Sequence, residues 1–287
     1  MSPPGIFFEA SSKVWRAVRD GRWHRLFGRL TPYGGLVAVM RGLADRLVRP
    51  PPSSPPTVFP RLSPAAAVEV LRADGVWASL QLPAASVAEI ARYAARNPCR
   101  LRQGDSELFE IDRVRDGRTP SGRPAPIVQV AAAEPCPAIE AIAADPLLLE
   151  TARRYLGFRP RRMERRLYWS PLGCLSDEAR RAGGQTVDFH YDIEVGRGLY
   201  AFFYIIGGDR HSGAHVAVAG THRGKPLRLA LAPAFQSDAA VFASFDRSRQ
   251  RVMEGGPGFG FLEDPACYHK VLPPSRGPRL VLQLRMF

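Results

Sequence analysis

The pattern of apolar and polar positions divides the chain into a helical front and a strand-rich remainder. Within residues 61–157 one helix is expected to begin at Ser63 and stop at Gly75, and a later pair is expected to be broken at Asp145. From residue 158 onward, Gly, Pro and Asp separate short apolar runs, which is typical of strands joined by turns. These runs are RRLYWSP, TVDFHYDIE, GLYAFFYIIGG, AHVAVAGTH, AAVFASF, GFGFLED, KVLPP and RLVLQLRMF. The pattern predicts an α+β protein with a mainly β core, a sandwich or barrel, and N-terminal helices packed on it.

Two segments precede this domain, which is expected to span residues 61–287. Residues 1–49 carry nine Lys and Arg against three Asp and Glu and contain two possible amphipathic helices. They fit a basic anchor on an anionic membrane, and equally a helix pair packed on the main domain with arginines facing water. Residues 50–60 are rich in proline and predict an extended linker.

The formal charge of +13 comes almost entirely from arginine, because lysine occurs only at positions 13, 225 and 270. Such an excess fits an anionic substrate or an anionic membrane surface. The chain lacks a recognition helix, an RNP-like motif and a concentrated Lys/Arg stripe, so no nucleic-acid partner is expected.

The four cysteines are far apart and form no CxxC pair, which favours free thiols in a reducing compartment. No signal peptide is recognisable, and no run approaches the roughly 18 apolar residues of a spanning helix. A cytoplasmic protein is expected, with peripheral contact at the inner face of the membrane if residues 1–49 act as an anchor.

The stretch FHYDIE carries the first candidate chemistry. In a strand, side chains alternate between two faces, so Asp188, His190 and Asp192 would share one face. An imidazole beside a carboxylate suits a metal, a proton relay or a salt bridge. Much later come His269 and then Arg279, which opens the last strand. Two histidines and a carboxylate can occupy one face of an octahedral iron(II), and an arginine fork can hold the far carboxylate of 2-oxoglutarate.

This order of residues resembles the phytanoyl-CoA dioxygenase-like family of Fe(II)/2-oxoglutarate-dependent oxygenases, over about residues 70–287. The similar stretches are ADGVWASLQLP, AADPLLLETARRYLGFRPR, FHYDIE, SGAHVAVAGTHRG and CYHKV with the arginine that follows. The resemblance implies a double-stranded β-helix (jelly-roll or cupin-like) fold, iron(II), 2-oxoglutarate and O2 as cofactor and co-substrates, and release of succinate and CO2. It maps His190, Asp192 and His269 onto the metal ligands, Arg279 onto the co-substrate arginine, and Tyr168 onto a region that often contacts co-substrate or substrate.

One departure from the family is Thr221-His222-Arg223 in place of a Ser-His-Lys-like turn. The presence of Asp192 argues against a halogenase, which typically has a small residue there. Two other readings stay open: a non-catalytic β-barrel binding module, and a cupin-like metalloenzyme that does not use 2-oxoglutarate.

Several other polar residues are rivals or neighbours of the expected site. Arg276 lies in a Pro-Ser-Arg-Gly turn, where contact with solvent is expected, whereas Arg285 shares a strand face with Arg279 and could contact substrate or solvent. His211 and His215 are expected to be polar groups of a loop and a strand, with substrate contact as the less favoured role.

The expected reaction is hydroxylation of a small-molecule, lipid-linked or sugar-linked anionic substrate, either a lipopolysaccharide sugar or a natural-product intermediate.

Overall fold

The computed structural model describes residues 56–103, 107–192 and 198–287. The segment 1–49 and most of the linker 50–60 lie outside these ranges, so the expectations about them stay predictions. The helices are α4 (Pro64–Asp74), α5 (Ala84–Arg96), α6 (Pro137–Ala143), α7 (Pro146–Leu156), α8 (Asp177–Ala182), α9 (Leu227–Leu231) and α10 (Asp238–Phe242). The strands are β1 (Val76–Gln81), β2 (Cys99–Leu101), β3 (Val128–Val130), β4 (Met163–Ser170), β5 (Leu199–Ile206), β6 (His215–Val218), β7 (Gln250–Met253), β8 (Phe259–Glu263), β9 (Tyr268–Val271) and β10 (Arg279–Met286).

The helix ends follow the signals in the sequence. The Ser63 side chain accepts a hydrogen bond from the first turn of α4, and Gly75 ends that helix in the left-handed conformation with φ of 74°. Asp145 begins α7 by accepting from the Leu148 amide at 2.8 Å, and Gly157 ends it with φ of 85°. The expected starts and stops of these helices are therefore confirmed.

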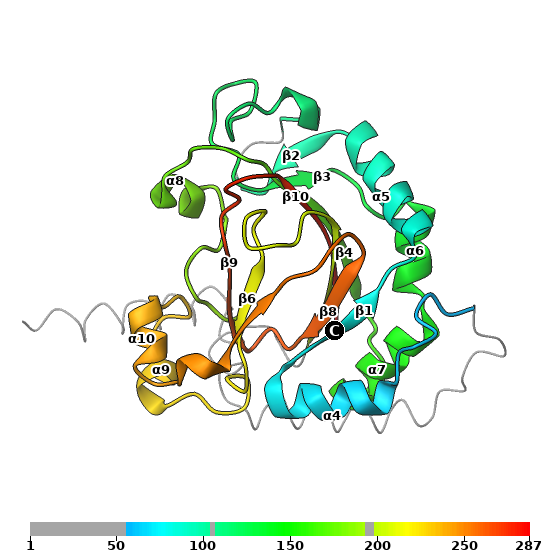
Figure 1. Cartoon of the computed structure of the whole chain (residues 1–287), viewed down its shortest axis with the longest axis vertical. Coiled ribbons are helices and arrows are strands. Elements are labelled where there is room, and N and C mark those ends of the chain that lie inside the picture. The colour runs from blue at the N-terminus through cyan, green and yellow to red at the C-terminus, as the bar shows by residue number, and fades with distance from the viewer. Residues whose placement is uncertain (1–55, 104–106, 193–197) are drawn as a thin grey trace, which may run out of the picture.

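Two antiparallel sheets enclose the core, and Figure 1 shows their strands as a ring seen end-on. Within the described residues, the larger sheet has seven strands in the order β1-β8-β5-β10-β4-β3-β2, and the smaller has three in the order β7-β6-β9. Strands β1, β2 and β3 come from the front of the chain, so residues 61–157 contribute to the larger sheet as well as forming helices. This architecture confirms the expected jelly-roll fold with helices packed on it.

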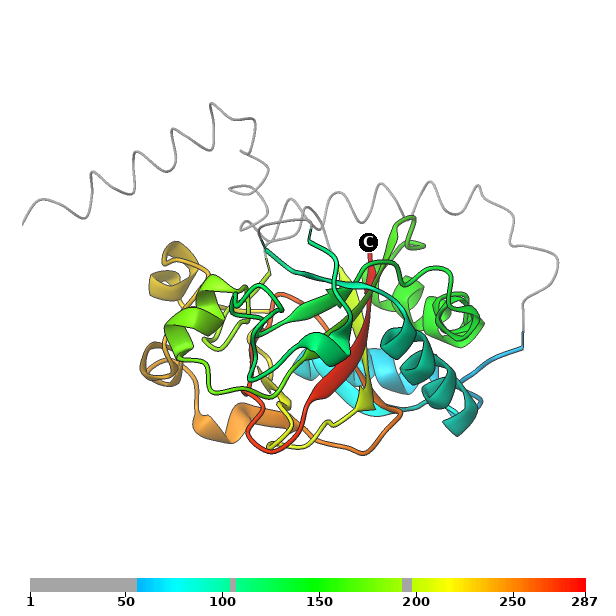
Figure 2. The same cartoon turned by 90° about the horizontal axis from the view of Figure 1, so that it is seen from above.

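The central strand β10 shows how the two faces of the larger sheet differ. One face carries Leu280, Leu282, Leu284 and Met286, which are fully buried in the cluster that includes residues of α4 to α7. The other face carries Val281, which packs with the inward aromatic residues Tyr200, Phe202, Tyr204 and Phe261. Figure 2 shows α4–α7, cyan to green, along one flank and α8–α10 on the other. The inward face of the larger sheet is thus covered largely by aromatic side chains. The other inward residues of β10 are Arg279, Gln283 and Arg285.

Two expected strands are not strands where the structure describes them. In the run TVDFHYDIE, residues 186–192 are described, and they form only isolated bridges, from Phe189 to Gln236 and from His190 to His269. The run AAVFASF lies in helix α10 and the turn after it, because the Ser237 side chain accepts from the Ala240 amide at 3.2 Å and caps a helix. No helix within the described ranges combines the length and hydropathy needed to cross a membrane.

Candidate metal centre

His190, Asp192 and His269 come together inside the barrel. Each offers one ligand atom, and these three atoms lie within 4.8 Å of one another. His190 Nε2 is 3.7 Å from Asp192 Oδ1, and the centres of the two imidazole rings are 4.2 Å apart. Both histidines are buried and Asp192 is half-buried. The structure therefore unites the three residues that the sequence nominated as metal ligands.

The backbone explains how residues so distant in the chain meet. His190 and His269 face each other in an antiparallel bridge, in which the His190 amide donates to the His269 carbonyl at 2.9 Å and the His269 amide donates back at 2.8 Å. The Asp192 amide donates to the Pro265 carbonyl at 2.8 Å. The chain around FHYDIE is thus fixed against the edge strand β9 by main-chain hydrogen bonds.

The ring orientation of both histidines leaves the same nitrogen for a ligand. Nδ1 of His269 lies 3.0 Å from the Cys267 carbonyl oxygen, and Nδ1 of His190 lies 3.4 Å from the Asp188 carbonyl oxygen. A carbonyl oxygen only accepts, so each Nδ1 carries the proton and each Nε2 keeps its lone pair. Burial, and then the nearby His269, lower the pKa of His190 to about 3, so that its ring is neutral.

The carboxylate of Asp192 is contacted by Arg285, which lies on β10. Nη2 of Arg285 lies 3.3 Å from Asp192 Oδ2, and the same nitrogen donates to the Tyr200 hydroxyl. Burial raises the pKa of Asp192, but the net shift is downward because His269, His190 and Arg285 favour the charged form. Arg285 therefore touches a candidate ligand, a role that the sequence did not assign to it.

A second buried pair, His215 and Glu263, adjoins the candidate ligands. Nε2 of His215 lies 2.9 Å from Glu263 Oε2, and the other carboxyl oxygen lies 3.7 Å from His269 Nδ1. Burial raises the pKa of Glu263 to about 8, and burial followed by the charge of Arg279 lowers that of His215 to about 3. Glu263 was not singled out from the sequence, although alternation in GFGFLED places it on one face with two inward phenylalanines.

Arg279 is buried at the start of β10, at the end of the interior opposite to Arg285. Its Nη1 donates to the Gly213 carbonyl and its Nη2 donates to Ser170 Oγ at 3.2 Å. Its Nε, also buried, has no hydrogen-bond partner within the described structure. Tyr168 lies on the neighbouring strand, half-buried; burial raises its pKa, whereas Arg279 acts to lower it.

The other residues considered from the sequence lie elsewhere. Arg276 is exposed in a turn, where its amide donates to the His211 carbonyl at 3.0 Å. His222 lies beside Cys267, with 3.7 Å between its Nδ1 and the sulfur. Arg276 thus lies in the turn expected for it, and His222 lies in the turn that follows β6.

Comparison with known proteins identifies structural relatives only. No family model matches the chain, and no curated protein sequence matches it. Among solved structures, the chain resembles EctD from S. alaskensis, crystallised with 2-oxoglutarate and 5-hydroxyectoine, with a TM-score of 0.56 and 19% identity over 80% of this chain and 78% of that one. It also resembles SnoN, a non-heme alpha ketoglutarate dependent epimerase from nogalamycin biosynthesis, with a TM-score of 0.54 and 16% identity over 78% and 84%.

A third relative is EvdO2 from Micromonospora carbonacea var. aurantiaca, with a TM-score of 0.51 and 16% identity over 80% of this chain and 93% of that one. The chain has the double-stranded β-helix fold. At these identities the likeness establishes the fold, and function has to be argued from the site.

Proposed function

We propose that the protein is an Fe(II)/2-oxoglutarate-dependent oxygenase. The observation that carries this proposal is the cluster of His190, Asp192 and His269, whose ligand atoms lie within 4.8 Å of one another. Two neutral imidazoles and one carboxylate are the donor set of mononuclear iron(II) sites that keep coordination positions open. Bound iron(II) with 2-oxoglutarate would activate O2 for oxidation of a substrate, with release of succinate and CO2.

The protein's own residues fit this chemistry. His190 and His269 would bind the metal through Nε2, since the Cys267 and Asp188 carbonyls hold each Nδ1 proton. Asp192 would bind as a carboxylate, kept charged and oriented by Arg285.

Arg279 supplies the best-placed group for the co-substrate. It is a buried cation whose Nε lacks a partner among the described residues, and its other nitrogens are fixed by Gly213 and Ser170. A carboxylate could accept from this nitrogen and offset the buried charge. We assign the far carboxylate of 2-oxoglutarate to Arg279, and place Tyr168 at the edge of the same pocket.

The similar structures support the proposed use of 2-oxoglutarate, but they do not determine which reaction the protein catalyses. EctD and EvdO2 were each crystallised with 2-oxoglutarate, and SnoN is described as dependent on it. SnoN is an epimerase, so the fold serves more than one oxidative outcome. We retain hydroxylation of a small anionic molecule, with membership of the phytanoyl-CoA dioxygenase-like family, as the finer part of the proposal.

The test is turnover of the co-substrate. Protein supplied with Fe(II), 2-oxoglutarate and air is expected to form succinate, measured by NMR, even without a substrate. Asp192→Ala should lose this turnover because it removes a ligand, whereas Asp238→Ala, an exposed carboxylate paired with Lys270, should keep it. Metal binding without succinate would favour the cupin-like alternative, and absence of both would favour the non-catalytic binding module.

A further inference from the structure

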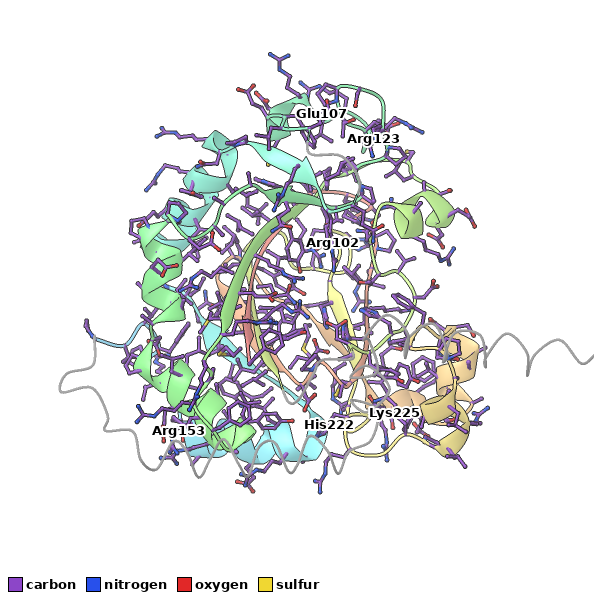
Figure 3. The ribbon with its side chains drawn as sticks, turned by 180° about the vertical axis from the view of Figure 1, so that it is seen from behind. Arg102, Glu107, Arg123, Arg153, His222 and Lys225 are labelled. Carbon is purple, nitrogen blue, oxygen red and sulfur yellow. The ribbon has the colours of Figure 1, made fainter. Side chains whose placement is uncertain are left out.

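A basic cavity lies on the inner wall of the larger sheet, outside the metal cluster. It is small and partly open to solvent. Its lining residues are Arg102, Ile127, Gln129, Arg166, Tyr168 and Gln283. Arg102 directly follows β2, and Figure 3 shows it overlapping the ring of strands when the molecule is seen from behind. Each polar side chain in this lining has at least one hydrogen-bond donor, and none of the lining side chains is a carboxylate.

The strand register places this cavity between Arg279 and Arg285, because Gln283 in its lining lies between these two residues on β10. Gln129 on β3 lies opposite Tyr168 on β4, and Arg166 lies opposite Gln283 on β10. The next inward residue along β10 is Arg285, which contacts Asp192 at 3.3 Å. The cavity wall therefore adjoins the carboxylate of the metal cluster, within reach of a substrate bound there.

Positive charge around the cavity is not balanced by the carboxylates that the structure describes there. Glu164 alone is shared by three guanidinium groups, with Arg166 at 2.7 Å, Arg162 at 3.0 Å and Arg285 at 3.3 Å. Arg102 donates to the Gly184 carbonyl at 3.4 Å, a neutral partner.

The electrostatics of Arg102 reflect this imbalance. Arg102 as a residue is exposed, but partial burial of its guanidinium lowers its pKa. The like charges of Arg166 and Arg285 lower it further, against the opposing effects of Tyr168 and Asp192. An anion placed between Arg102 and Arg166 would relieve this repulsion and receive charge-assisted hydrogen bonds.

We propose that Arg102 and Arg166, with Tyr168, Gln129 and Gln283, form a subsite for an anionic group of the primary substrate, a carboxylate, phosphate or sulfate. The inference rests on the proposed oxygenase function, because it names the substrate class of that same site. Tyr168 lies at the boundary between this subsite and the co-substrate pocket at Arg279, and Arg279 itself does not line the cavity.

The test uses inorganic sulfate as the probe, titrated calorimetrically into anaerobic full-length protein loaded with Fe(II) and 2-oxoglutarate at ionic strength held constant with KCl. Saturable binding is expected, weakened about tenfold or more in Arg102→Gln and in Arg166→Gln, because each loses a hydrogen bond between charged groups. Arg113→Gln is the matched control, since it removes the same charge from a side chain that is 69% exposed.

The visible absorption of the Fe(II)–2-oxoglutarate complex is recorded in the same samples. Sulfate binding that leaves this absorption unchanged supports the subsite. Absent binding, binding equal in all variants, or displacement of 2-oxoglutarate by sulfate would overturn it. If the absorption never forms yet sulfate binds in a manner that depends on Arg102, the anion site stands and the oxygenase function fails.

Discussion

At the scale of single residues, the sequence identified the candidate ligands but not the groups that support them. His190, Asp192, His269 and Arg279 could be chosen because their types and order match a known chemistry. Glu263 could not be chosen that way, because its significance comes from contacts with histidines on other strands. Supporting contacts depend on register between strands, which one-dimensional spacing does not specify.

The contact from Arg285 to Asp192 leads to a prediction about metal affinity. Arg285→Met keeps an apolar stem over Tyr200 but removes the donor to Asp192. Affinity for Co(II), measured by competition with a chelating dye, should fall about 10- to 100-fold, as is usual when a group that orients a metal ligand is lost.

Arg162→Met is the matched control for this experiment. Arg162 also pairs with Glu164 and stacks over Phe287, but the structure gives it no contact with Asp192. It should bind Co(II) like the unmodified protein. Equal affinity in Arg285→Met would show that Arg285 does not position the carboxylate.

Glu263 predicts a pH dependence of stability. Burial raises its pKa from 4.5 to about 8, among His215, His269, Asp192 and Asp264. A raised folded-state pKa contributes stability that is complete below the unfolded value and lost as pH rises through about 8. Glu263→Gln, which cannot ionise, should therefore gain stability relative to the unmodified protein between pH 6 and pH 9, on the order of a few kcal/mol.

Chemical denaturation of both metal-free proteins at the two pH values measures this difference, because all other titrating groups are shared. A constant difference in the free energy of unfolding would mean that Glu263 keeps an ordinary pKa in the folded protein.

At the scale of elements, short sequence signals predicted where helices begin and end better than they predicted whether a run is a helix or a strand. Ser63, Gly75, Asp145 and Gly157 acted as caps because each effect is contained within a few residues. The short run AAVFASF was read as a strand because its apolar residues are continuous, whereas the serine before it caps a helix. The strands β2 and β3 have only three residues each, too few for an alternation of apolar and polar residues to be recognised in the sequence. They are extended because they pair with neighbouring strands of the sheet.

The glycines that end α4 and α7 allow a prediction in which the stability losses of two similar variants are compared. Both Gly75 and Gly157 have positive φ, so alanine at either should cost about 1–2 kcal/mol in backbone strain. A Cβ at Gly75 would also lie 2.4 Å from Cys267 Sγ and 2.5 Å from His222 Nδ1, whereas none of the described atoms lies within 4 Å at Gly157. Gly75→Ala should therefore lower the free energy of unfolding clearly more than Gly157→Ala, as measured by urea denaturation. Equal losses would mean that the close contacts at Gly75 relax without cost.

At the scale of the whole molecule, the fold was predictable because both its hydrophobic pattern and its residue order pointed to one architecture. Helices first and strands later predicted helices packed on a β core, and the structure confirms this arrangement. The basic cavity could not be foreseen, since it joins β2, β3, β4 and β10 through pairings distant in sequence. The net charge of +13 gave the sign of the charge around this cavity but not the positions of Arg102 and Arg166 in its lining.

The central claim is that His190, Asp192 and His269 bind iron(II) and that Arg279 anchors 2-oxoglutarate beside it. The most direct measurement is an anaerobic titration of metal-free protein with Fe(II) and then 2-oxoglutarate, followed by visible absorption. A charge-transfer band is expected only when both are present, lost in His269→Ala and weakened in Arg279→Gln, with Asp238→Ala unchanged. No band in the unmodified protein, or an undiminished band in His269→Ala, would contradict the account.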